Sequence, residues 1–216
     1  MKRHRVAVLI SGSGSNLQAL IDASQAADFP AEIILVISNR SDAYGLTRAR
    51  HANIATCVLP HGDYKSRDDF DEAIHQCLME HRIDYVCLAG FMRLLTEAFV
   101  AKWAGKMLNI HPSLLPSYVG LNTHARVLAD GVKVTGCTVH QVTAALDAGP
   151  IIIQAAVPVY ATDTVETLQQ RVHLAEHIIY PEALRLLINA TSEDVNTRTV
   201  QAAVTDSLLI SPPVPR

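Results

Sequence analysis

Short runs of aliphatic residues alternate with amphipathic segments through the first half of the chain. Polar residues do not occupy every second position of these runs, which is typical of strands that a parallel sheet covers on both faces. The runs predict five strands, at residues 5–10, 31–37, 55–60, 84–90 and 106–111. The segments between them predict helices at residues 16–27, 43–52, 67–81 and 96–104. Together they predict an α/β fold: an open, mostly parallel, Rossmann-like sheet with helices on both faces.

The pattern changes after residue 111. Residues 112–122 have the composition of a loop, and we expect a short helix to follow until Gly131 ends it. Two extended runs, at residues 132–142 and 150–160, can pair with each other as an antiparallel extension in the C-terminal half.

One long helix and a weakly patterned tail complete the chain. The helix is expected from about Asp163, with Thr162 or Asp163 as its N-cap, and Pro181 should bend or end it. No strong pattern follows in the tail, residues 191–216, which closes on SPPVPR as a frayed end. Because no repeat or linker is visible, residues 1–190 are interpreted as a single domain with halves of about 1–105 and 106–190.

Composition excludes several classes of protein. The chain has 216 residues, and its net charge of -3 gives no broad field that would attract nucleic acid or an anionic membrane. The first apolar run is too short for a signal peptide or a membrane span. Four scattered cysteines without CxxC spacing argue against a disulfide framework, and the ten histidines show no metal-binding spacing. We therefore expect a cytoplasmic, metal-free protein.

A glycine-rich turn joins the first strand to the first helix in the run LISGSGSNLQAL. Gly12 and Gly14 allow a tight backbone, and the amides of Gly14, Ser15 and Asn16 would point outward at a helix N-terminus. Such a terminus binds phosphate through its N–H groups and the helix dipole. The alternative is an ordinary turn in which Asn16 is only the N-cap.

A dinucleotide site fits this turn less well than a single phosphate does. Leu17 stands where the third glycine of GxGxxG is expected, and Asn39 stands where an NAD site needs an acidic residue. Arg40 could still meet a 2′-phosphate, so an NADP site stays open.

Asn109 and His111 end the fifth strand in the run LNIHPSLLP. Residues two apart in a strand share a face, so the amide and the imidazole project together at the carboxyl end of the sheet, where ligands bind. Together they could stabilise a developing oxyanion in acyl transfer. Asp147 in LDAGPII is either a turn residue or a carboxylate that keeps His111 charged. No nucleophile elbow is present, so a covalent acyl-enzyme is not indicated.

Six motifs in one order resemble the folate-dependent phosphoribosylglycinamide formyltransferases, over about residues 5–190. The motifs are VLISGSGSNLQALID, LAGFMRLL, NIHPSLLPSY, VTGCTVH, LDAGPIIIQ and AEHIIYPEAL. The resemblance implies an enzyme of purine synthesis that moves a formyl group from 10-formyltetrahydrofolate, as cosubstrate, to the amine of glycinamide ribonucleotide. It implies a nucleotide-phosphate half before about residue 105 and a catalytic and folate half after it. It also implies Asn109, His111 and Asp147 as the catalytic trio.

The resemblance further assigns binding roles to two sets of residues. For glycinamide ribonucleotide they are Gly14, Ser15, Asn16, His173 and Glu176, with His173 also open to interpretation as a solvated helix residue. For the folate they are Arg67, Met92, Arg93, Leu94, Leu95, Asn109, Thr143, Ala144, Ala145, Leu146 and Asp147. The chain departs from many bacterial relatives at Ser117, Val119, Asn122, Ala144 and Ala145. These changes bear on loop closure and affinity, and we expect the loop at residues 113–134 to move on binding.

Three rival functions stay open. A formyltetrahydrofolate hydrolase normally has an extra N-terminal domain, and the transformylase of initiator methionyl-tRNA has a C-terminal RNA-binding domain. We expect neither, because the first strand begins near residue 5 and the pattern ends near residue 190. A non-catalytic nucleotide sensor of the same fold would not need the trio. A monomer or homodimer acting on small molecules is the expected form.

Overall fold

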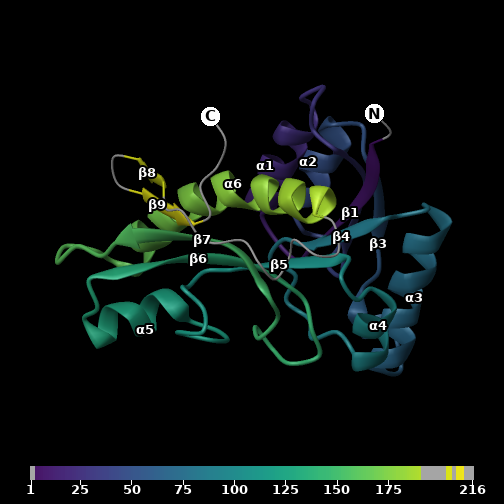
Figure 1. Ribbon diagram of the computed structural model, residues 1–216. Helices are drawn as coiled ribbons and strands as arrows, with labels where there is room; N and C mark the ends of the chain where they lie inside the picture. The colour runs from purple at the N-terminus through teal and green to yellow at the C-terminus, as the bar shows by residue number, and fades with distance from the viewer. Residues whose placement is uncertain (1–2, 191–202, 206–207, 212–216) are drawn as a thin grey trace. The chain divides into compact units, whose positions relative to one another are not determined.

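The computed structural model describes residues 3–190, 203–205 and 208–211 (Figure 1). This part of the chain divides into two compact units. The first holds the described residues up to Asn109 together with Val142–Ala144, and the second holds Ile110–Gln141 and the described residues from Ala145 onward. Strand β5 (Met107–His111) therefore begins in the first unit and ends in the second.

The first unit is built on a parallel sheet. Its other strands are β1 (His4–Ile10), β2 (Ala31–Ser38), β3 (Ala55–Val58) and β4 (Tyr85–Leu88). The order is β3-β2-β1-β4-β5, and each neighbouring pair runs parallel. The carboxyl ends of all five strands consequently point the same way, which is the side where open α/β sheets bind ligands.

Four helices and one short turn of 3₁₀ helix connect these strands. They are α1 (Ser15–Ser24), α2 (Gly45–His51), the 3₁₀ turn His61–Asp63, α3 (Arg67–Glu80) and α4 (Glu97–Lys102). Helix α1 contacts α2, and α3 contacts α4 (Figure 1). The apolar side chains Phe70, Ile74, Cys77 and Leu78 of α3 are buried in one core with residues of β1, β2 and β4. The predicted elements of the first half are thus confirmed, with their ends shifted by a few residues.

The second unit contains the expected antiparallel pair, β6 (Val134–Gln141) and β7 (Ile151–Pro158). Helix α5 (Thr123–Asp130) ends at Gly131, whose φ of 66° suits a residue without a side chain, as the sequence predicted. Helix α6 (Val165–Asn189) packs on β6 and β7 (Figure 1). The α/β class with antiparallel strands in the C-terminal half is confirmed.

The N-cap predicted for α6 is wrong. Neither Thr162 nor Asp163 caps the helix; Thr164 does, because its hydroxyl accepts from the backbone N–H of Thr167 while the Thr167 side chain accepts from the N–H of Thr164. The Asp163 carboxylate is instead engaged by Arg171, at 2.7 Å. Because Arg171 occupies the Asp163 carboxylate, the cap is the next residue, Thr164.

Pro181 does not end α6, which continues to Asn189. Proline removes one backbone hydrogen bond and crowds the preceding turn. On both sides of it the helix buries apolar side chains, among them Tyr180, Ala183, Leu184 and Leu187. This burial outweighs the loss of a single bond.

Two short strands lie where the sequence predicted no element. Strand β9 (Leu208–Ser211) pairs with β7, and β8 (Ala203–Thr205) pairs with β9, both antiparallel. Ser211 therefore belongs to a strand, and the rest of the expected frayed end lies outside the described residues. No helix among the described residues is long and apolar enough to cross a membrane.

Candidate active site

His111 and Asp147 form a buried pair in the second unit. His111 is the last residue of β5, and Asp147 lies in the connection between β6 and β7. Nδ1 of His111 lies 3.4 Å from Oδ2 of Asp147, and each side chain is 7% exposed. Asp147 has a φ of 50°, a left-handed conformation that aspartate tolerates better than most residues. The structure therefore brings together two of the three residues of the expected trio.

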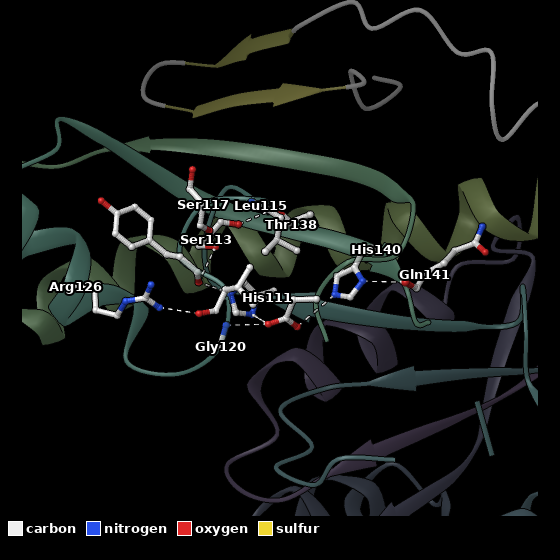
Figure 2. A network of polar contacts seen from close by, with 12 residues as sticks. His111, Ser113, Leu115, Ser117, Gly120, Arg126, Thr138, His140 and Gln141 are labelled. Carbon is white, nitrogen blue, oxygen red and sulfur yellow. Dashed lines mark hydrogen bonds and ion pairs between the residues drawn. The ribbon is translucent and has the colours of Figure 1, made fainter. Parts of the chain in front are cut away.

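Backbone groups of the loop before α5 hold both members of the pair. The N–H of Gly120 donates to Oδ2 of Asp147 at 3.0 Å, and Nε2 of His111 donates to the carbonyl oxygen of Tyr118 at 2.9 Å. Figure 2 shows His111 and Gly120 within this network. Both ring nitrogens of His111 thus face oxygen acceptors, and a ring with a proton on each nitrogen can donate to both.

A hydroxyl on β6 fixes the path of that loop. Oγ1 of Thr138 donates to the carbonyl of Ser113 at 2.7 Å and accepts from the N–H of Leu115 at 3.0 Å (Figure 2). The amide of Gln154 adds bonds to Thr138 and to the Leu115 carbonyl. Ser113 in turn donates to the carbonyl of Ser117 at 2.6 Å. These bonds anchor the loop just before the Tyr118 carbonyl that His111 contacts.

His140 is a residue of this site that the sequence reasoning missed. Its Nδ1 donates to the carbonyl of Gln141 at 2.9 Å, and its Nε2 lies 3.8 Å from Oδ1 of Asp147 (Figure 2). Burial lowers the pKa of His140, although Asp147 opposes the shift. The pairing of β6 with β7 is irregular between Val139 and His140, and such bulges re-aim side chains beside active sites. The available signal was a histidine at the end of the motif VTGCTVH.

Asn109, the third residue of the expected trio, lies two positions before His111 on β5. It belongs to the first unit, where it pairs with Leu88 of β4 and is half-buried.

The glycine turn of the first unit is the start of α1. Gly14 is the N-cap, with a φ of 70°, and the first helical hydrogen bond runs from the N–H of Gln18 to the Gly14 carbonyl. Asn16 is buried and lies inside the helix, so the alternative in which Asn16 is the N-cap is wrong. The backbone N–H groups of Ser15 and Asn16 lie in the first turn, where N–H groups do not take part in the hydrogen bonds of the helix itself. N–H groups in this position can bind an anion.

Helix α2 packs against this turn and explains the glycine at position 14. A Cβ on Gly14 would lie 2.7 Å from the Cα of Gly45, and the Gly45 N–H donates to the Gly12 carbonyl at 3.0 Å. Nε of Arg48 donates to the carbonyl of Ser13 at 2.9 Å. Arg48 therefore adds a positive charge to the turn. No motif indicated Arg48, because it lies 35 residues further along the chain.

Glu176 and His173 lie one turn apart on α6 in the second unit. Glu176 is 3% exposed, and its Oε2 lies 4.0 Å from Nε2 of His173. Burial lowers the pKa of His173. Burial also lowers the pKa of His124 on α5, and the charges of His173 and His111 lower it further. Glu176 is thus a buried carboxylate beside a partly exposed histidine. Among the residues that the structure describes, no group of three His, Cys, Asp or Glu side chains could hold a metal ion.

The residues expected at the folate are mostly exposed. In the first unit Arg67 begins α3, and Met92, Arg93, Leu94 and Leu95 follow β4. Met92 and Leu94 expose 65% and 59% of their surface. Thr143 and Ala144 belong to the same unit, whereas Ala145 and Leu146 belong to the second.

Comparison with known proteins identifies a family over most of the chain. Residues 4–184 match the model of the formyl transferase family. A phosphoribosylglycinamide formyltransferase of Escherichia coli (strain K12) is 51% identical over 177 residues, covering 82% of this chain and 83% of that protein. The human trifunctional purine biosynthetic protein adenosine-3 is 58% identical over 190 residues, covering 88% of this chain. This chain spans only 19% of that human protein's length.

Solved structures agree with the sequence comparison. The crystal structure of a phosphoribosylglycinamide formyltransferase from Brucella melitensis matches with a TM-score of 0.84 and 51% identity. The match covers 88% of this chain and 98% of that one.

Proposed function

This chain belongs to the formyl transferase family, and from that premise we propose that it is a phosphoribosylglycinamide formyltransferase. The reaction transfers the formyl group of 10-formyltetrahydrofolate to the amine of N1-(5-phospho-D-ribosyl)glycinamide. The product is formylglycinamide ribonucleotide, an intermediate of de novo purine biosynthesis. Relatives that bear the enzyme's name at about half identity support the proposal.

The observation that carries the proposal is the buried contact between His111 and Asp147. The folate supplies an activated formyl group. The amine of the ribonucleotide attacks the carbon of this formyl group. A new C–N bond forms, and the bond between the formyl carbon and the folate nitrogen breaks. His111, charged beside Asp147, and the amide of Asn109 stabilise the negative charge that develops on the formyl oxygen. Asp147 helps to pass the proton lost by the amine, through water, to the departing folate nitrogen.

His111 can play this part only if the loop releases it. Its Nδ1 faces Asp147, so Nε2 is the ring nitrogen that would have to reach the formyl oxygen. In this structure Nε2 donates to the Tyr118 carbonyl at 2.9 Å. We expect the segment at residues 113–134 to move when substrates bind, exchanging the Tyr118 carbonyl for the formyl oxygen.

The ribonucleotide is proposed to bind through its two ends. The 5′-phosphate is held by the amides of Gly14, Ser15 and Asn16 at the start of α1, with Arg48 supplying nearby positive charge. Glu176 accepts hydrogen bonds from the ribose end, and His173, 4.0 Å from it, orients the carboxylate.

The folate is proposed to lie against apolar side chains and backbone edges. The exposed Met92 and Leu94 suit a flat heterocycle, and the backbone from Thr143 to Asp147 offers it amides and carbonyls. Arg67 and Arg93 are exposed cations that fit the acidic end of a folate. Location in the cytoplasm and a monomeric or homodimeric state stay predictions from the sequence.

A single comparison tests the proposal. Purified protein is mixed with 10-formyltetrahydrofolate, or with a 10-formyl dideazafolate, in the presence and absence of glycinamide ribonucleotide. Loss of the formyl group that requires the ribonucleotide is expected. Loss without it would indicate a hydrolase instead, and no loss in either mixture would leave a non-catalytic nucleotide sensor.

A further inference from the structure

A network of side-chain hydrogen bonds crosses the carboxyl ends of the parallel strands in the first unit. Ser11 follows directly after β1, and Asn39 follows directly after β2. The hydroxyl of Ser11 donates to Oδ1 of Asn39 at 2.6 Å and accepts from the backbone N–H of Met92 at 2.8 Å. The side-chain nitrogen of Asn39 in turn donates to Nδ1 of His61 at 3.2 Å. The network therefore ties together residues that follow β1, β2, β3 and β4.

The two side chains at the centre of this network are buried. Ser11 is 8% exposed and Asn39 is 4% exposed. A buried hydroxyl or amide is costly unless its hydrogen bonds are made, so these bonds fix the orientation of both groups. A hydroxyl has a single proton, which here goes to Asn39, so Ser11 meets the Met92 N–H as an acceptor. Asn39 thus orients Ser11, and Ser11 holds the backbone of Met92.

Residues 91–95, which include Met92, are neither helix nor strand, so contacts with other elements set their course. Ser11 holds the beginning of this segment. Asp71 of α3 holds its end, because the buried carboxylate accepts from the backbone N–H of Thr96 at 2.6 Å. The segment is fixed at both ends, while apolar side chains on it stay exposed. Loss of the Ser11 bond would release one end and leave the other in place.

We propose that Ser11 is a positioning residue for the formyl donor, acting through the backbone of Met92 and oriented by Asn39. The inference rests on the proposed function, in which the folate lies against the segment at residues 91–95. The effect of Ser11 falls on binding of the donor and not on the chemical step, because neither bond of its hydroxyl goes to the proposed catalytic trio.

The test measures steady-state formyl transfer from a 10-formyl dideazafolate to glycinamide ribonucleotide. Ser11→Ala removes the acceptor of the Met92 N–H, so KM for the folate should rise about three- to tenfold, the effect of one lost hydrogen bond. We expect kcat to stay unchanged, because an interaction lost equally from the bound substrate and the transition state raises KM alone. Ser24→Ala is the matched control, since its hydroxyl donates only to the carbonyl of Ile21 in its own helix among the contacts described. KM for the folate should not change in that variant.

A second variant acts through the same hydroxyl. Asn39→Ala leaves Ser11 in place but removes the acceptor that orients it, so KM for the folate should also rise. The double variant should be little worse than Ser11→Ala, because the two residues share one path to Met92. Rises in KM that multiply in the double variant would overturn this path. Urea denaturation checks that each variant is folded, and Asn39→Ala decides by itself if Ser11→Ala is not.

Three further outcomes would overturn the inference. A fall in kcat, or an equal rise in KM for the ribonucleotide, would indicate a general disturbance of the sheet and not a positioning role. An unchanged KM for the folate in Ser11→Ala, with transfer by the wild-type protein intact, would overturn this inference alone. Absence of transfer by the wild-type protein would refute the proposed function, and this inference with it.

Discussion

The carboxylate of Asp147 lies 3.4 Å from Nδ1 of His111, with both side chains almost wholly removed from water. Water screens electrostatic interactions poorly at such burial, so the interaction between the carboxylate and the imidazole ring is stronger than it would be at a surface. The same carboxylate accepts a hydrogen bond from Gly120, which holds it in place without neutralising it.

Replacement of the carboxylate by an amide tests the pair directly. Asp147→Asn can keep an acceptor for the Gly120 N–H but loses the charge that His111 faces. We expect kcat for formyl transfer to fall by about 10²–10³, the size of effect seen when an oxyanion donor is lost. Steady-state kinetics measures this, and circular dichroism checks that the variant is folded. Turnover close to wild type would remove Asp147 from the mechanism.

His111→Ala removes the donor itself. A loss of kcat of about 10²–10³ is again expected. If the two residues act as one unit, as proposed, the double variant with Asp147→Asn should be little worse than either single variant. Independent, multiplicative losses would show that the two side chains act separately.

The glycine turn offers a matched pair of substitutions. In Gly14→Ala the new Cβ would meet the Gly45 Cα at 2.7 Å, and alanine would have to adopt the positive φ of 70°. We expect the free energy of unfolding to fall by at least about 1–2 kcal/mol. Gly12→Ala is the control, because nothing lies within 4 Å of its Cβ position. Chemical denaturation compares the two, and equal stabilities would contradict the close packing of α1 and α2.

Arg48 is expected to serve the phosphate turn. Arg48→Ala loses the bond to the Ser13 carbonyl and the local positive charge, so KM for glycinamide ribonucleotide should rise about tenfold or more, with KM for the folate unchanged. Arg50→Ala is the control, since Arg50 bonds only to Leu46 and Thr47 of its own helix among the contacts described. An equal rise in KM for both variants would mean a general effect of charge.

Buried histidines predict a loss of stability in mild acid. Burial lowers the pKa of both His124 and His140, so the unfolded chain binds more protons than the folded chain once the pH falls below about 6.5. The contribution is fully present above that pH and is lost as the pH falls. Each residue adds a slope of at most about 1.4 kcal/mol per pH unit.

Urea denaturation between about pH 7 and pH 5.5 measures this slope. His124→Gln should flatten it, whereas the same change at the exposed His51 should leave it unaltered. An unchanged slope in His124→Gln would exclude His124 as a source of the acid sensitivity.

Local pattern was enough to predict most of the fold. Non-alternating aliphatic runs predicted the five parallel strands, because a strand buried on both faces is apolar throughout. Amphipathic segments predicted the helices, because a helix buried on one face repeats its apolar residues with the helical period. The failures lie where a tertiary contact decided the outcome. Asp163 is as good a cap by type as Thr164, but Arg171 engages it. Pro181, expected to bend or end the helix, does not end it, because its neighbours are buried.

Local patterns and motifs were sufficient to establish the class of fold, the glycine turn before α1, and the presence of an amide, an imidazole and a carboxylate in motifs of one family. Folding of the chain brought Asp147 to His111, 36 positions apart in the numbering, and added His140 and Arg48 to the two sites. Periodicity records which face of an element is buried, and it carries no information about which distant side chains meet. That information resides in how strands pair and loops close, since the irregular pairing of β6 with β7 at His140 and the backbone N–H of Gly120 help to place His140 and Asp147.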